Sequence, residues 1–219
     1  MCNLYHHSVS SADAKLFFES AGLASLEAPT GDNNEPAYVG ADADGPVFAV
    51  EDGKVVMHMR RWGFPSWKDG SKPITNVRNL ESSWWRGANG DYITNAEYRC
   101  LIPFDRFAEW DGTEKRNAWF TIEAEQSFFV GFWRPWNGER LKEIEGKKRR
   151  ARQVANWELF AFMTTEPNPT VAAIHPKAMP VIITEADEAQ RWLGGGDESL
   201  ELQGPLPDAM VNKSPYEAG

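Results

Sequence analysis

The feature that most constrains the fold is a succession of short apolar and aromatic runs that begins near residue 99. The runs are only a few residues long, and Pro, Gly and Asn between them supply turns. Runs of this length bounded by turn residues predict β-strands rather than helices. The predicted strands are 100–104, 107–110, 118–122, 128–133, 157–164 and 179–183.

Two helices are predicted outside these strands. Ser10 and the residues after it resemble a capped amphipathic helix that ends near Gly22. Thr184 is followed three residues later by an acid, which is typical of a helix start. This second helix should run to about Leu193 and end at the glycines 194–196.

A hairpin completes the predicted secondary structure. The apolar runs 47–50 and 54–59 flank Asp52-Gly53, a dipeptide that favours a two-residue turn. The sum of the elements predicts an α+β fold, with mostly antiparallel strands in a large barrel-like sheet and a few flanking helices.

The chain of 219 residues is expected to form one domain, 1–219. Within it, residues of about 137–153 form a charged excursion between strands, with a basic run at 147–152. The tail from about 197 is weakly patterned. The basic run is interpreted as a solvated loop that can also touch phosphate.

Composition limits the cellular compartment and the partners that are expected for this chain. The chain has no long apolar run and no secretory signal, so we expect a cytoplasmic monomer that does not engage a membrane. Cys2 and Cys100 are the only cysteines and no C-x-x-C occurs, which favours a reducing compartment and predicts neither a metal nor a cofactor. The net charge of −9 argues against non-specific attraction to nucleic acid, but leaves room for a local basic groove.

The N-terminus offers an unusual nucleophile. If the initiator methionine is removed, Cys2 carries a free α-amine and a thiol on adjacent carbons. Such a 1,2-aminothiol can condense with an aldehyde through nitrogen and then close a ring through sulfur. Position alone does not distinguish this from an ordinary second residue.

Two ionisable residues are candidates for proton transfer. Glu109 lies among aromatics on a predicted strand, where burial would raise its pKa, or it is an edge-strand glutamate that points to water. His175 precedes a proline and has the side chain best suited to acid–base work near neutrality, or it is a structural histidine of an extended loop.

Polar and aromatic residues between 60 and 78 suggest nucleic-acid contacts. Asn76 can form a turn or hold a sugar oxygen or the N-terminus, and Arg78 with Arg61 can hold phosphates. Trp67, with Trp62 and Phe64 in the same segment, can stack on bases or fill a corner of the core.

These segments together resemble the SOS-response-associated peptidase family, the abasic-site processing proteins. The resemblance spans most of the chain and depends on the order and spacing of its segments. They are Met1-Cys2, 61–67, 74–81, 100–110, 160–165, Ile174-His175, 179–183 and Val211-Asn212.

The resemblance implies that Cys2 crosslinks covalently to abasic sites in single-stranded DNA, through a Schiff base and then a thiazolidine, and that the peptidase label refers to release of Met1 or of the protein itself. By this resemblance, the reactive residues are Cys2, Asn76, Glu109 and His175. It also implies a DNA-damage response protein that associates with the nucleoid when it is bound to damaged DNA.

By the same resemblance, Arg61, Trp67 and Arg78 would hold the DNA. The family's usual Cys-Gly-Arg start is here Cys2-Asn3-Leu4, which removes an arginine expected near phosphate. Two other functions stay open: an amidohydrolase that uses Cys2 on a small amide, and a non-catalytic binder of single-stranded DNA.

Overall fold

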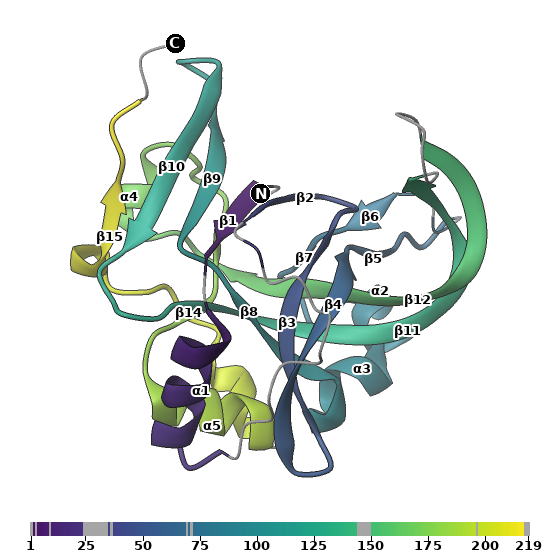
Figure 1. Ribbon diagram of the computed structural model, residues 1–219. Coiled ribbons are helices and arrows are strands. Elements are labelled where there is room, and N and C mark those ends of the chain that lie inside the picture. The colour runs from purple at the N-terminus through teal and green to yellow at the C-terminus, as the bar shows by residue number, and fades with distance from the viewer. Residues whose placement is uncertain are drawn as a thin grey trace.

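The structure is a computed structural model of the chain (Figure 1). It describes residues 2, 4–8, 10–23, 35, 37–68, 70, 72–143, 150–195 and 197–216. Among these residues, no helix is long and apolar enough to cross a membrane.

Five strands form an antiparallel sheet in the order β15-β10-β9-β1-β2. They are β1 (Leu4–His7), β2 (Ala37–Gly40), β9 (Arg106–Asp111), β10 (Arg116–Ile122) and β15 (Val211–Lys213). Strand β1, which begins at Leu4, thus lies between two segments that are distant in sequence, β2 and β9.

A second sheet closes into a five-stranded barrel. Its strands are β3 (Asp44–Glu51), β4 (Lys54–Trp62), β8 (Arg99–Pro103), β11 (Phe128–Glu143) and β12 (Arg150–Thr165). Neighbouring strands are antiparallel except β4 and β12, whose parallel pairing at Leu159↔Arg61 completes the circle. The predicted α+β fold with a mostly antiparallel, barrel-like sheet is therefore confirmed.

Three short strands extend this sheet: β7 (Asn76–Val77), β13 (Met179–Pro180) and β14 (Ile182–Ile183). Strands β5 (Phe64–Pro65) and β6 (Pro73–Ile74) pair with each other in a separate two-stranded sheet. Strand β7 pairs in parallel with β12, which brings residue 76 to the side of the barrel that faces the five-stranded sheet.

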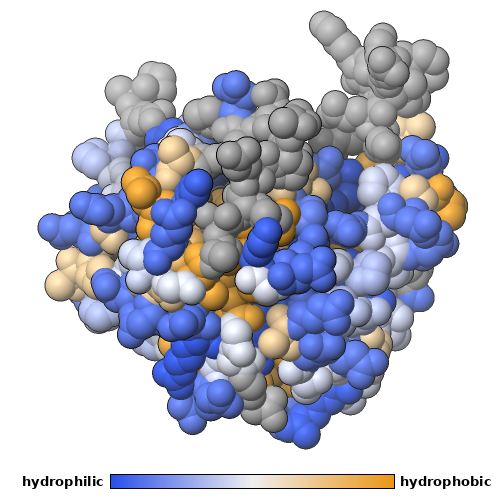
Figure 2. Space-filling view, turned by 60° about the horizontal axis from the view of Figure 1, so that its bottom comes forward, coloured by the Kyte–Doolittle hydropathy of each residue, from blue (hydrophilic) through white to orange (hydrophobic). Residues whose placement is uncertain are grey.

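Helices cover the remaining surfaces. They are α1 (Ser11–Ser20), α2 (Ser83–Arg86), α3 (Gly90–Thr94), α4 (Pro169–Ala172) and α5 (Ala186–Gly194), with short 3-10 turns at Ala96–Tyr98, Asp197–Leu202 and Asp208–Met210. Helices α1 and α5 lie side by side at one end of the barrel (Figure 1). Figure 2 shows the face at this end, which is largely hydrophilic around a central hydrophobic area.

Local sequence explains several of these boundaries. Ser10 caps α1 by accepting a hydrogen bond from the Asp13 amide at 3.1 Å. The β3–β4 turn has Asp52 and Gly53 at φ of 49° and 77°, which fits the predicted two-residue turn. The start of α5 differs from the prediction: Glu185, not Thr184, is the N-cap, because Glu185 and Glu188 form a reciprocal capping box.

The segment predicted as a charged excursion is largely strand. Strands β11 and β12 pair from Gly131↔Phe162 out to Glu143↔Arg150 and form one long curved hairpin (Figure 1). Its polar residues pair across the ribbon, as Arg152 does with Glu139 at 2.7 Å. Such a ribbon lacks the apolar alternation that identifies a half-buried strand. Positions 144–149, which include the first three residues of the basic run, lie outside the described residues.

Two apolar cores share the barrel strands. Alternate residues of each strand contribute to a core under α1 and α5 and to a second core against the five-stranded sheet. The second core contains stacked rings such as Phe104 on Phe129, with centroids 3.8 Å apart. Burial of each phenylalanine contributes about 1.5–3 kcal/mol, so this core fixes the sheet that carries residues 2 and 109.

Candidate active site

The four predicted reactive residues approach one another where the five-stranded sheet meets the barrel, and Cys2 lies two residues before β1 begins. The Asn76 side-chain amide, on β7, donates to the Cys2 carbonyl at 3.1 Å and to the Thr75 hydroxyl at 2.7 Å. Asn76 therefore anchors the chain start rather than forming a turn. Its other side-chain atom, Oδ1, is buried and has no hydrogen-bond partner among the described residues.

Glu109 lies on the buried side of β9. It shares that side with Phe107, whereas Trp110 points outward, and its own side chain is only 1% exposed. The edge-strand alternative, a glutamate that points to water, therefore does not apply. Burial raises the pKa of Glu109 from 4.5 to about 7, so the carboxyl can both give and accept a proton near neutrality.

His175 approaches this carboxyl from the loop after α4. Its backbone N–H donates to the Val171 carbonyl at 2.8 Å, which fixes the loop. The ring Nδ1 is 3.9 Å from Glu109 Oε2, too long for a direct hydrogen bond. Burial, with a contribution from the charge of Lys177, lowers the pKa of His175, so the ring is mainly neutral at pH 7.

The Cys2 thiol is fully buried beside these groups. Its Sγ lies 3.5 Å from the Leu4 carbonyl. Burial, and then the nearby Glu109 charge, raise the pKa of the thiol well above its ordinary value. The sulfur is therefore held as a neutral thiol that needs a proton acceptor before it attacks.

Among the predicted DNA contacts, Trp67 and Arg78 lie on the surface. Trp67 is 75% exposed. The Arg78 side chain is 45% exposed, and its guanidinium is 3.8 Å from the carboxylate of Glu166, itself 85% exposed. A pair so exposed is weak, so Arg78 can exchange this partner for a phosphate.

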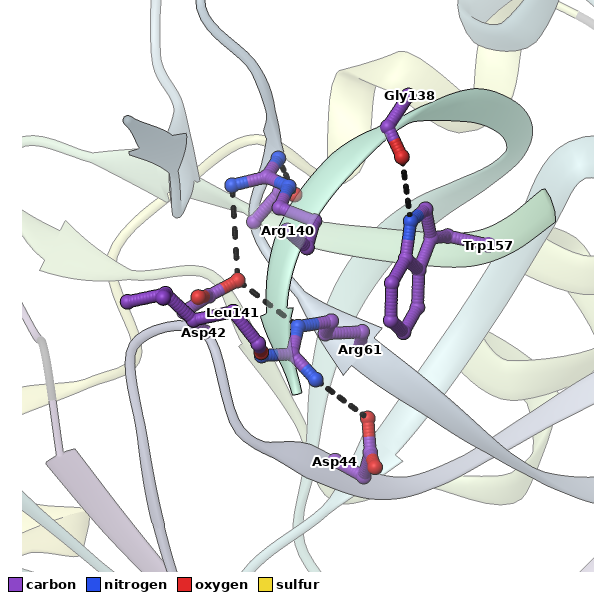
Figure 3. A network of polar contacts seen from close by, with 8 residues as sticks. Asp42, Asp44, Arg61, Gly138, Arg140, Leu141 and Trp157 are labelled. Atoms are coloured by element: carbon purple, nitrogen blue, oxygen red, sulfur yellow. Dashed lines mark hydrogen bonds and ion pairs between the residues drawn. The ribbon is translucent and has the colours of Figure 1, made fainter. Parts of the chain in front are cut away.

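Arg61 lies elsewhere. Figure 3 shows its guanidinium inside a polar network that includes residues near the end of β11. Nε donates to Asp42 at 2.9 Å, Nη2 donates to the Leu141 carbonyl, and Nη1 is 3.8 Å from Asp44. Arg140 on β11 meets the same Asp42 oxygen at 3.5 Å. The Arg61 side chain is only 7% exposed, so its position favours a structural role over the predicted contact with DNA.

Two aromatics of the same segment are also interior. Trp62 and Phe64 are fully buried, and Trp62 stacks on Phe162 with a centroid distance of 5.0 Å. Of the two alternatives predicted for this segment, Trp62 and Phe64 therefore fill a corner of the core. Trp67 is the aromatic residue of the segment whose exposure allows contact with a base.

Two exposed residues near the site are not among the DNA contacts predicted from the sequence. Trp110 is 55% exposed beside Glu109, and Lys177 is exposed two residues after His175. The period of two along β9 places Trp110 opposite Glu109, but only the fold shows which side is buried. No group of three His, Cys, Asp or Glu side chains that could bind a metal occurs in the described part of the chain.

Comparison with solved structures shows the same fold in three bacterial proteins. A protein from Bordetella bronchiseptica has a TM-score of 0.69 at 16% identity, over 99% of this chain and 100% of its own. A protein from Bacteroides thetaiotaomicron has a TM-score of 0.66 at 19% identity, over 95% and 90%. A phage-related protein from Bordetella bronchiseptica has a TM-score of 0.65 at 17% identity, over 99% and 95%.

Comparison with curated proteins gives no match. A family model described as SOS response associated peptidase (SRAP), in contrast, matches residues 1–215. The match covers both the segments that position the site and the sheets that carry them. The chain therefore belongs to the SOS response-associated peptidase family.

Proposed function

We propose that this protein, after removal of Met1, crosslinks itself through Cys2 to abasic sites in single-stranded DNA. The family is named for the SOS response, so its members are associated with DNA damage. The proposal of crosslinking through Cys2 rests on one observation. The Asn76 side-chain amide donates a hydrogen bond to the Cys2 carbonyl, beside the buried Glu109. This arrangement fixes an aminothiol next to a carboxyl that titrates near neutrality.

The chemistry forms two bonds and releases one water. The α-amine of Cys2 adds to the C1′ aldehyde of the ring-opened deoxyribose, and the resulting hydroxyl leaves as water to give a C=N bond. The sulfur then adds to the imine carbon as the thiol proton passes to nitrogen. The product is a five-membered thiazolidine that joins protein and DNA.

Each side chain has a role that its environment supports. Glu109, with a pKa of about 7, protonates the leaving hydroxyl and accepts the thiol proton. The mainly neutral His175 assists opening of the sugar ring. Asn76 holds the Cys2 carbonyl through Nδ2, and its Oδ1, which has no hydrogen-bond partner in the described part of the chain, accepts a hydrogen bond from the new amine or a sugar hydroxyl.

The DNA strand would be held by exposed residues around this site. Trp67 and Trp110 offer ring faces for unpaired bases, and Arg78 and Lys177 offer charge to phosphates. We leave Arg61 out of this group because it is bound inside the hairpin network. The binding surface is thus local, which is compatible with a net charge of −9.

A crosslinking assay tests the proposal. Purified protein is incubated with an end-labelled single-stranded oligonucleotide that contains one abasic site and is analysed on a denaturing gel. Without a reductant, wild type should give a shifted band, and Cys2→Ala and Cys2→Ser, which lack the thiol, should give none. Both variants keep the α-amine, so each should give a band only when borohydride traps the imine.

Two results would contradict the proposal: no band with wild type whose intact mass shows loss of Met1, or an equal band with Cys2→Ala. Hydrolysis of a small amide such as glutamine without DNA crosslinking would instead identify an amidohydrolase.

A further inference from the structure

The five-stranded sheet has a second face, opposite the one that carries Glu109, and its outward side chains are unusual. Side chains alternate between the two faces along each strand, and Ala108 faces outward but is buried. The outward residues of the four strands β2, β1, β9 and β10 are Tyr38, Gly40, Leu4, His6, Arg106, Ala108, Trp110, Asn117, Trp119 and Thr121. They include three aromatic rings and two basic side chains.

The rings and the arginine on this face are packed together. The Arg106 guanidinium carbon lies 5.3 Å from the centroid of the Tyr38 ring and 5.0 Å from that of Trp119. The two rings are 5.6 Å apart, and Arg106 also donates to the Tyr38 hydroxyl. His6 meets the edge of Tyr38 at 4.6 Å. We call Tyr38, Arg106 and Trp119 the outer platform.

The outer platform is accessible and carries no carboxylate. Tyr38 is 55% exposed despite its contacts, so part of its ring meets solvent. None of the outward positions named above is Asp or Glu, in a chain with 32 acidic residues. The neighbouring Asp105 is paired with His6 at 2.8 Å. This face therefore offers π surface and positive charge, a combination suited to nucleobases and phosphates.

The platform also lies close to the candidate active site. Leu4, two residues after Cys2, pairs with Ala108 in the middle of the outer face. Trp110 opens onto the same face and adjoins Glu109 in the chain. A DNA strand whose abasic site reaches Cys2 can thus continue around the end of the sheet at which β1 begins, and onto the outer face.

We propose that the outer platform binds unpaired bases of the DNA strand at a distance of a few nucleotides from the abasic site. A base stacks on the exposed ring of Tyr38, and Arg106 holds that ring and the Trp119 ring in place while it faces the phosphate. The platform thereby lengthens the strand that the protein covers. This inference deepens the proposed function, but binding to an undamaged strand requires neither Cys2 nor a lesion.

The test measures binding without crosslinking. In a Cys2→Ala background, fluorescence anisotropy gives the affinity for undamaged oligothymidylates of about 4 and about 15 nucleotides, the range that single-strand sites cover. Tyr38→Ser should weaken binding of the longer strand about tenfold, since stacking of a base contributes a factor of this order. Binding of the shorter strand should change little. Tyr38→Phe keeps the ring and should bind like the parent.

A matched control is Leu16→Ala, which removes a side chain that is 66% exposed on α1. It should leave both affinities unchanged, and melting temperatures of all variants show whether they fold. Equal affinity of folded Tyr38→Ser and the parent for the longer strand would overturn the inference, as would an equal loss in Tyr38→Phe.

A second measurement uses wild type and needs no variant to fold. A bromodeoxyuridine-substituted undamaged strand is irradiated with the protein, and the crosslinked peptides are mapped by mass spectrometry. Crosslinks at Tyr38 or Trp119 support the platform. Crosslinks confined to Trp67 and Trp110 overturn it, whether or not abasic DNA reacts with Cys2.

Discussion

Replacement of Glu109 by glutamine should remove a pH dependence of stability that the buried carboxyl creates. In the folded chain, burial raises the pKa of this group from 4.5 to about 7. Below pH 4.5 the carboxyl is protonated in both states. Between pH 4.5 and 7 the unfolded chain loses this proton while the folded chain keeps it, so stability falls as pH rises.

The structure sets the size of the effect. The folded and unfolded pKa values differ by about 7 − 4.5, or about 2.5, and each unit corresponds to about 1.36 kcal/mol. Ionised Glu109 therefore costs about 3 kcal/mol above pH 7. Equilibrium urea unfolding of wild type and Glu109→Gln at pH 4.5 and pH 8 measures it.

When the pH is raised from 4.5 to 8, the free energy of unfolding of Glu109→Gln should rise by about 3 kcal/mol relative to that of wild type. The control is Glu201→Gln, whose side chain is 74% exposed and paired with Arg191 at the surface, and which should follow wild type. A Glu109→Gln variant that keeps the full pH dependence of wild type would refute the buried, proton-holding carboxyl, and with it the proposed acid–base role.

Other variants separate structural residues from functional ones. Arg61→Gln should reduce the free energy of unfolding by about 3 kcal/mol, because it breaks a largely buried pair with Asp42; a stable variant that loses only DNA affinity would contradict this. Arg78→Gln should change stability by less than about 0.5 kcal/mol while it weakens binding to undamaged single-stranded DNA severalfold at low salt, as anisotropy would show. Asn76→Asp replaces a donor to the buried Cys2 carbonyl by an acceptor, so it should slow crosslinking at least about tenfold and lower the free energy of unfolding by about 1–3 kcal/mol; crosslinking at the wild-type rate would argue against its anchoring role.

Much of the fold could be predicted from local patterns. The strands between 100 and 133 and the hairpin at Asp52-Gly53 appear as predicted, because apolar runs and turn residues report them directly. Closure of the barrel could not be predicted in this way. It depends on parallel pairing of β4 with β12, nearly 100 residues apart (Leu159↔Arg61), and no local pattern encodes that contact.

The site shows the same division. The period of two along β9 placed Phe107 and Glu109 on one face, but which face is buried depends on the core supplied by distant strands. Arg61 and Arg78 looked alike in sequence. They differ because the turn after β2 brings Asp42 to Arg61, whereas the charged partner of Arg78 is Glu166, which is 85% exposed.

The central claim is a covalent bond from Cys2 to the abasic sugar, and the mass of the adduct tests it most directly. Wild type is incubated with single-stranded DNA that contains one abasic site, and the product is digested and analysed by mass spectrometry without reduction. We predict an N-terminal peptide that lacks Met1 and carries the sugar fragment at Cys2, with the loss of one water and no free thiol. An unmodified Cys2 peptide, or an adduct on a lysine such as Lys177, would contradict it.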